Sequence, residues 1–232
     1  MATVPLRGLL AGAVLLAGAV WIAAHPAALP SIAPATASAP PREATGVDDP
    51  ASLAARLIAA ARSQEGVTTL YDPAYVALAY PGGDVPRDRG VCTDVVVRAY
   101  RDAFGLDLQK LVHEDMARAF SAYPRRWGLA APDAHIDHRR VPNLQTFFTR
   151  HGVSLPVTAD PADYAPGDLV TQTVDGRLPH VAIVTGLRSL DGARPLVVHN
   201  IGRGTRLDDT LFAFPLTGHF RYGPPARPPS KG

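Results

Sequence analysis

The hydrophobic pattern changes near residue 153, and this change limits the possible folds more than any other feature of the chain. Before it, apolar residues recur at helical spacing; after it, short apolar runs alternate with turn signals. The first pattern predicts helices over residues 50–65, 92–104, 108–123 and 142–150. The second predicts strands over residues 153–157, 169–174, 180–185, 195–200, 212–214 and 219–222, with a hairpin turn at 175–176. Helices followed by an antiparallel sheet indicate an α+β domain, with the N-terminal helices packed on the C-terminal sheet.

Both ends of the chain are expected to lie outside this domain. Residues 9–24 form an unbroken apolar run, so we interpret residues 1–37 as a signal peptide or an N-terminal inner-membrane anchor. Residues 38–49 are interpreted as a Pro/Ala-rich linker and residues 223–232 as a flexible tail, which leaves 50–222 as the folded domain. We therefore expect an exported protein of the periplasm or cell envelope. The net charge of +2 and the lack of basic runs argue against a nucleic-acid partner, and the sequence does not indicate an oligomeric state.

Cys92 is the only cysteine, so it cannot form a disulfide within the chain. It lies where a turn ending at Gly90 becomes a helix, and the free N–H groups and dipole of a first helical turn favour a thiolate. Asp94 opposes this effect, because a nearby anion raises the pKa of a thiol. We interpret Cys92 as a nucleophile; the alternative is a buried structural thiol.

His180 and His199 lie on two predicted neighbouring strands, and a hairpin would place their side chains together. A thiol, an imidazole and a third polar group are the reacting set of a thiol protease or amidase. In this interpretation Cys92 is the nucleophile, His180 is the general base and acid, and His199 orients His180. A shift of one residue in the strand register would put Asn200 in the place of His199.

Residues 135–140 form a charged segment, His-Ile-Asp-His-Arg-Arg. Its spacing does not match a metal site and offers no fourth ligand, so we interpret it as a polar loop beside the cleft and expect no metal or cofactor. Arginines in this loop could bind substrate carboxylates through paired hydrogen bonds, and Asp94 could hold a substrate amine. The predicted substrate-binding residues are Asp94, Asp137, His138, Arg139 and Asn200. Asp168 is interpreted as a turn residue that bonds its own backbone.

Four features resemble those of the NlpC-type papain-like cell-wall peptidases. They are a cysteine that begins a helix (Cys92), Pro166-Gly167-Asp168-Leu169-Val170, Pro179-His180-Val181-Ala182-Ile183-Val184, and Val197-Val198-His199-Asn200. From about Ala51 to Tyr222 the chain also resembles the YijF-like exported bacterial family, catalogued as domain of unknown function 1287, most distinctively over residues 136–144. It departs from the NlpC pattern around the cysteine, where Val91 replaces the usual Asp and Thr93-Asp94 replaces Ser-Gly. The stretch between Cys92 and His180 is also longer than is usual there.

The resemblance implies a papain-like fold and a cysteine hydrolase that cleaves an amide bond in peptidoglycan. The bond would lie within a stem peptide or between the lactyl group and the peptide. One alternative is a catalytically inactive module of the same fold that binds a cell-wall peptide or an envelope protein. Another is a cysteine acyltransferase or esterase, since the same three residues can transfer other acyl groups.

Overall fold

The computed structural model describes residues 49–224. The predicted signal or anchor (1–37), the linker up to residue 48 and the tail from residue 225 lie outside the described residues. The helices are α1 (Pro50–Arg62), α2 (Cys92–Phe104), α3 (Leu108–Ala119) and α4 (Val141–His151), with short 3-10 helices η1 (Phe120–Ala122), η2 (Asp137–Arg139) and η3 (Pro161–Asp163). The four predicted helices are therefore confirmed, with ends that differ by a few residues.

Local sequence signals set the helix ends. Pro50 occupies the first turn of α1. Gly105 ends α2 in a left-handed conformation with φ of 68°, which glycine adopts without strain. Asp107 begins α3, and its side chain accepts the Gln109 N–H.

Six strands form an antiparallel sheet in the order β3-β8-β4-β5-β6-β7. They are β3 (Val153–Ser154), β4 (Leu169–Val174), β5 (Leu178–Arg188), β6 (Pro195–Asn200), β7 (Thr205–Asp208) and β8 (Leu216–Arg221). Two further short strands, β1 (Leu70–Tyr71) and β2 (Arg89–Gly90), pair in parallel just before α2. The α+β class with an antiparallel sheet is thus confirmed.

Two details of the sheet differ from the prediction. The strand predicted at residues 212–214 is wrong, because this segment forms a turn in which the Ala213 N–H donates to the Thr210 carbonyl. Strand β7 was not predicted, since Thr-Arg-Leu-Asp has no apolar alternation to mark it. The hairpin turn at Asp175-Gly176 is confirmed, and both residues have positive φ, at 49° and 70°.

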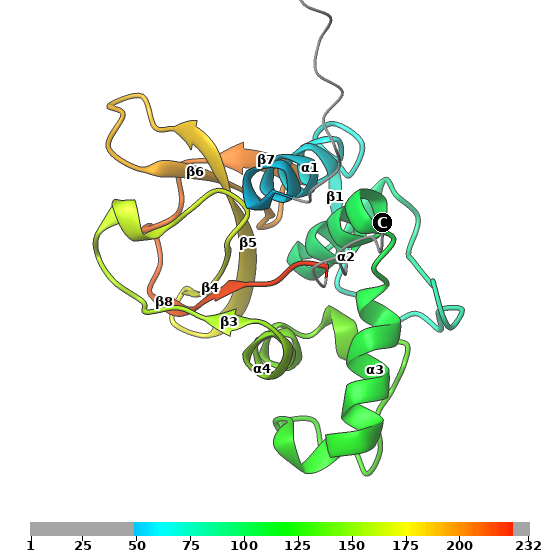
Figure 1. Cartoon of the computed structure of the whole chain (residues 1–232). Helices are drawn as coiled ribbons and strands as arrows, with labels where there is room; N and C mark the ends of the chain where they lie inside the picture. The colour runs from blue at the N-terminus through cyan, green and yellow to red at the C-terminus, as the bar shows by residue number, and fades with distance from the viewer. Residues whose placement is uncertain (1–48, 225–232) are drawn as a thin grey trace, which may run out of the picture. The chain divides into compact units, whose positions relative to one another are not determined.

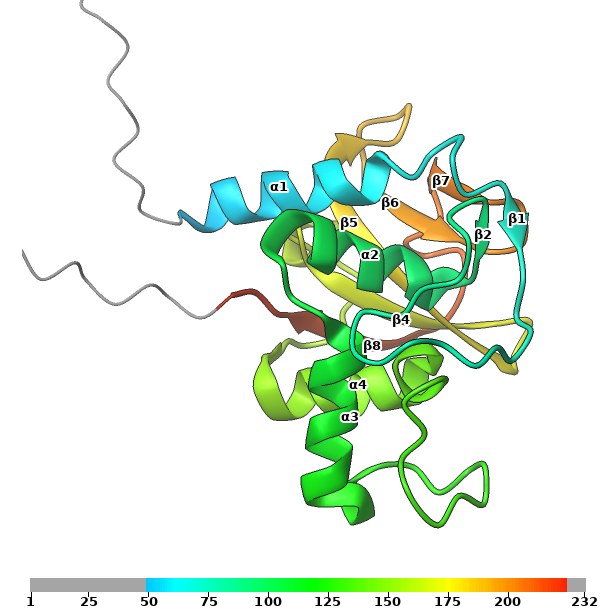
Figure 2. The same ribbon diagram turned by 90° about the vertical axis from the view of Figure 1, so that its right-hand side faces the viewer.

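The sheet separates two hydrophobic clusters. Val181 and Ile183 of β5 face the larger cluster, which the sheet shares with the helices, while Ala182 and Val184 face the smaller one. Helices α1 and α2 lie next to each other across the first face (Figures 1 and 2). Because neighbouring side chains of β5 point to opposite sides of the sheet, His180 lies on the same face as Ala182 and on the opposite face from Val181.

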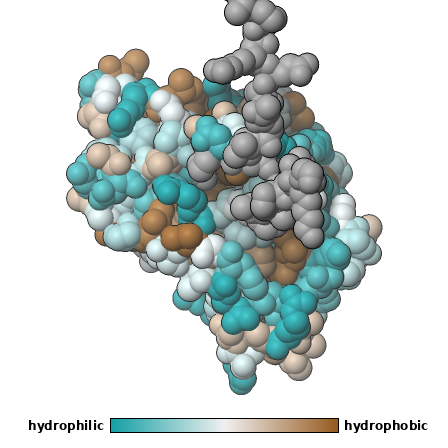
Figure 3. Space-filling model, in the orientation of Figure 1, coloured by the Kyte–Doolittle hydropathy of each residue, from teal (hydrophilic) through white to brown (hydrophobic). Residues whose placement is uncertain are grey.

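The face drawn in Figure 3 is mainly hydrophilic, with small hydrophobic patches. Among the described residues, no helix has the length and apolar character needed to cross a membrane.

Candidate active site

Cys92 is the first residue of α2, as the sequence predicts, and its side chain is buried with 4% exposure. Val91 precedes it in extended conformation, and the Asp94 and Val95 N–H groups donate to the Val91 carbonyl. The Cys92 N–H has no intrahelical partner at this position, as expected for the first turn of a helix. A carbonyl oxygen held beside the sulfur would therefore meet a free donor and the positive end of the α2 dipole.

Both carboxylate oxygens of Asp94 accept hydrogen bonds from other groups of the protein. Its Oδ2 accepts the Val91 N–H at 2.7 Å, and Arg139 donates to Oδ1 and Oδ2 at 2.9 Å each. Both side chains are nearly fully buried, with exposures of 2% for Arg139 and 4% for Asp94. Asp94 therefore anchors the start of α2, and we reassign it from substrate binding to positioning.

Arg139 also holds the segment that follows β1. It donates to the carbonyls of Asp72 and Ala74, in addition to Asp94. This single guanidinium therefore connects three parts of the chain around the cysteine: η2, the start of α2 and the segment after β1. Its Nε and Nη2 atoms donate to the Asp94 carboxylate, so this edge of the guanidinium is occupied within the protein. This corrects the prediction that the same edge binds a substrate carboxylate.

A second buried arginine, Arg98, holds the loop that leads into α2. Its guanidinium pairs with Asp84 at 2.8 Å and donates to the carbonyls of Val85 and Arg89. A Cβ at Gly90 would lie 2.9 Å from Asp94 Oδ2, so only glycine fits at this place. Sequence analysis missed Arg98, because a cation within an apolar helix pattern gives no sign of which loop it will reach.

His180 and His199 meet as predicted. His180 Nε2 lies 2.8 Å from His199 Nδ1, and both rings are buried. The far nitrogen of His199, Nε2, faces Asp208 Oδ2 at 3.4 Å and the Thr210 hydroxyl at 3.5 Å. Asp208 lies on strand β7, which was not predicted, so no local pattern indicated this third contact.

The chain of contacts defines the tautomers of neutral rings. A carboxylate only accepts, so His199 carries its proton on Nε2 and accepts at Nδ1. His180 then donates from Nε2, which leaves its lone pair on Nδ1. This Nδ1 atom makes no hydrogen bond to any described residue, and it is not fully enclosed by the protein. The free lone pair of His180 is therefore within reach of solvent.

Cys92 packs in the hydrophobic cluster on the Val181 face of β5, whereas His180 lies on the other face of this strand. No hydrogen bond joins the Cys92 sulfur and His180 in the described structure, and the ring of His180 follows the opposite face of β5 from Val181. The backbone N–H of Val181, the next residue, acts on the sulfur and lowers its pKa. The structure thus brings the two histidines together. The Cys92 thiol of α2 meets the backbone of Val181, which is the residue after His180 on β5.

Burial dominates the protonation of both groups. It raises the pKa of Cys92 to about 11, with a further rise from Asp94. Burial and the neighbouring His199 lower the pKa of His180 to about 3. The thiolate expected from the helix terminus is therefore not the resting form, because desolvation outweighs the dipole and the nearby N–H groups. At pH 7 the resting site holds a thiol and a neutral imidazole.

This state predicts the pH dependence of alkylation. A pKa of about 11 means that roughly one thiol in ten thousand is ionised at pH 7. The rate of reaction of Cys92 with iodoacetamide is expected to rise about ten-fold per pH unit from pH 7 to pH 10. Mass spectrometry of the alkylated protein at timed intervals measures it. A rate that is already at its plateau near pH 6 would show a preformed thiolate and contradict this assignment.

A pocket of about 200 Å³ opens beside the sulfur, and we call it the cysteine pocket. Its wall is formed by Tyr71, Pro73, Val91, Cys92, Trp127, Ile136, Arg139, Arg140, Val141, Pro142 and Pro179. Of the predicted substrate-binding residues, only Arg139 belongs to it. Pro179, the residue before His180, also lines this pocket, whereas His180 and His199 do not.

The remaining predicted substrate-binding residues have internal roles. Asp137 is buried in η2, where its carboxylate accepts from the Arg140 guanidinium and the Asp133 N–H. His138 is buried beside it, and burial lowers its pKa to about 3. Asn200 donates to the Gly90 carbonyl at 3.0 Å and so ties the end of β6 to the loop before Cys92. We therefore reassign Asp137 and Asn200 to holding the site in place, whereas the Nδ1 atom of the buried His138 has no hydrogen-bond partner among the described residues.

Asp168 does accept the Ala165 N–H, as predicted for a turn residue. It is also fully buried between His219, at 2.9 Å, and Arg221, at 2.7 Å, which the sequence did not indicate. Within residues 49–224 no group of three or more His, Cys, Asp or Glu side chains could hold a metal ion.

Fold and site together define an α+β protein with a buried cysteine at a helix start and a buried histidine pair on an antiparallel sheet. The chain belongs to the family described as "Domain of unknown function (DUF1287)", whose model matches residues 58–222. It is 54% identical over 162 residues to "Uncharacterized protein YijF" of Escherichia coli (strain K12), a match that covers 70% of this chain and 78% of that protein. The predicted family membership is confirmed, and the resemblance to the NlpC-type peptidases stays a prediction.

Proposed function

We propose that this protein is an exported cysteine hydrolase of papain-like, NlpC-type fold that cleaves an amide bond, with a peptidoglycan peptide as its substrate. The observation that carries the proposal is the series of contacts His180–His199–Asp208, which leaves an imidazole lone pair free on the residue next to Val181, whose backbone N–H acts on the Cys92 sulfur. A buried histidine without a catalytic role needs one hydrogen-bond partner; two histidines in series with a carboxylate are the arrangement that orients a base. An exported location in the periplasm or cell envelope fits a wall substrate.

The reaction follows from the roles of these groups. As the sulfur attacks the substrate carbonyl carbon, its proton passes to His180 Nδ1, and the carbonyl oxygen gains the Cys92 N–H as a donor. His180 then gives this proton to the leaving amine as the C–N bond breaks. Water hydrolyses the resulting thioester with His180 again as base, which restores the thiol and releases a carboxylic acid. The first step requires the sulfur and Nδ1 to come into hydrogen-bond contact when substrate enters.

Product analysis tests this proposal. The purified protein is incubated with muropeptides and with intact sacculi, and the products are identified by mass spectrometry. Fragments that gain the mass of one water at an amide bond support the hydrolase and identify the bond. Intact substrates after incubation with a folded protein count against it.

One observation favours a second candidate, an inactive module of the same fold that binds a cell-wall peptide or envelope protein. The buried thiol has a raised pKa and no hydrogen bond to His180 in the described part of the chain, as a site that has lost catalysis would show. Binding of sacculi without any product would support this module. An acyltransferase or esterase for lipid substrates is less well supported, because two arginines line the cysteine pocket.

The Asp208→Asn variant tests the contact between His199 and Asp208. Asparagine can donate to His199 Nε2, which disturbs the tautomers of both rings, so kcat should fall by roughly ten- to a hundred-fold with little change in KM. The matched control is Asp175→Asn, which removes the same charge at the exposed β4–β5 turn. Steady-state hydrolysis of a muropeptide gives both constants. Equal kcat values for the two variants would remove Asp208 from the proposed mechanism.

A further inference from the structure

Two arginines and no acidic residue line the cysteine pocket, and each arginine pairs with a buried carboxylate outside this wall, Arg139 with Asp94 and Arg140 with Asp137. The Asp94 carboxylate balances the charge of Arg139, because both of its oxygens accept hydrogen bonds from this guanidinium. Arg140 is the cation in this wall that retains hydrogen-bonding capacity for a ligand.

Arg140 is held in a fixed place with part of its guanidinium free. Its Nη1 donates to Asp137 at 3.1 Å, and its central carbon lies 4.1 Å from the ring centroid of Trp127. The Nε and Nη2 atoms of Arg140 make no hydrogen bond to any described residue, and neither atom is fully enclosed by the protein. A guanidinium that is stacked on an indole and restrained from one side has lost most of its rotamer freedom before a ligand arrives.

Trp127 gives this wall an apolar surface next to the charge. Trp127 is 38% exposed, although the Arg140 guanidinium lies over its ring. Both Trp127 and Arg140 line the same pocket as the Cys92 sulfur. A substrate that reaches the sulfur therefore passes a cation with free donors and an aromatic face.

We propose that the cysteine pocket selects an acidic peptide, whose carboxylate near the scissile bond binds the free edge of Arg140 beside Trp127. This inference rests on the proposed function, because it assigns a substrate class to the same site. Arg140 is a binding residue in it and takes no part in proton transfer.

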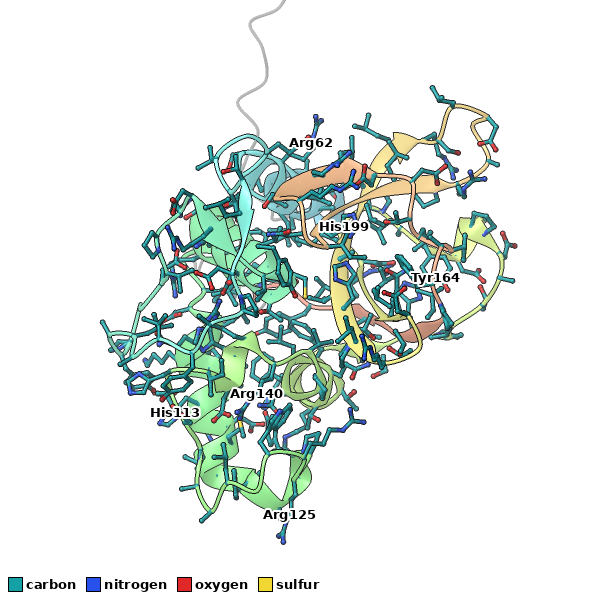
Figure 4. All side chains as sticks on the ribbon, turned by 180° about the vertical axis from the view of Figure 1, so that it is seen from behind. Arg62, His113, Arg125, Arg140, Tyr164 and His199 are labelled. Carbon is teal, nitrogen blue, oxygen red and sulfur yellow. The ribbon has the colours of Figure 1, made fainter. Side chains whose placement is uncertain are left out.

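Equilibrium binding to a protein that cannot turn over tests the charge preference directly. The Cys92→Ala protein is titrated with acetyl-Ala-Glu-Ala-amide and with the nearly isosteric acetyl-Ala-Gln-Ala-amide, by calorimetry. The acidic peptide is expected to bind roughly ten-fold more tightly, as one charge-assisted contact allows. Adding Arg140→Gln should remove this difference, whereas adding Arg125→Gln should not. Arg125 is exposed and extends from the end of the molecule away from Arg140 (Figure 4). Equal affinities for the two peptides in the Cys92→Ala protein would overturn the proposal.

Alkylation of the wild-type protein gives an independent readout. Iodoacetate carries a negative charge and iodoacetamide does not, so the ratio of their rates at pH 9 reports the charge preference of the pocket. Relative to 2-mercaptoethanol, this ratio is expected to be several-fold higher for Cys92 and to return to the free-thiol value in Arg140→Gln. A ratio at or below that of 2-mercaptoethanol would contradict the inference. Turnover of muropeptides is measured separately, so a failed hydrolase and a failed charge preference give different results.

Discussion

The Cys92→Ala protein is expected to release no fragments from muropeptides or sacculi that the wild-type protein cleaves. Removal of a covalent nucleophile takes away the whole acyl-enzyme route, so the rate should fall by at least about a thousand-fold. The chain has no second cysteine that could replace it. Product formation is followed by mass spectrometry over a time course long enough to detect a residual rate at this level.

The variant must also be shown to fold and to bind. Cys92 is a small buried side chain, and its replacement by alanine removes only the sulfur, so circular dichroism and Tm should change little. Sedimentation of the protein with sacculi measures retained binding. Equal cleavage by the folded variant and the wild type would exclude the cysteine mechanism, and binding with no cleavage by either protein would favour the inactive module.

The second large effect is expected from Arg139→Ala, on stability. This change leaves the Asp94 carboxylate buried without its guanidinium and leaves the carbonyls of Asp72 and Ala74 without their donor. Breaking one partner of a buried ion pair lowers the free energy of unfolding by about 3–5 kcal/mol. Urea denaturation monitored by circular dichroism measures it, with the slope of the transition as a check on two-state behaviour.

A double variant separates the unpaired charge from the lost packing. Adding Asp94→Asn to Arg139→Ala removes the uncompensated carboxylate, so the double variant should be more stable than Arg139→Ala alone. Arg118→Ala, at an exposed position on α3, is the control for loss of one arginine. A loss below about 1 kcal/mol for Arg139→Ala would show that the pair does not hold the start of α2.

Much of the scaffold could be predicted because its signals are local. Gly105 and Asp107 mark the break between α2 and α3 by their own conformational preferences. The Asp175-Gly176 turn sets the pairing of β4 with β5, and the alternation along β5 then places His180 on a defined face. The meeting of His180 with His199 followed from this register together with the adjacent strand β6.

The missing parts depend on contacts between distant segments. Asp208 could not be found, because β7 is a short polar strand that forms only by pairing with β6. The reassignment of Asp94 and Arg139 has the same cause: each looked available for substrate until the fold set them against each other. Charge alone does not tell whether a side chain will face a ligand or another part of its own chain.

The hydrogen bond from Asn200 to the Gly90 carbonyl has a consequence for the order of assembly. It joins residues 110 positions apart, so the loop before the nucleophile receives this restraint only after β6 has been synthesised and paired. The histidines and Asp208 also come from this late half of the chain. A nascent or truncated chain that ends before residue 180 therefore contains the thiol without either histidine and without Asp208. If the chain is exported, as we propose, a site that becomes complete only with the whole fold protects the compartment in which the chain is made.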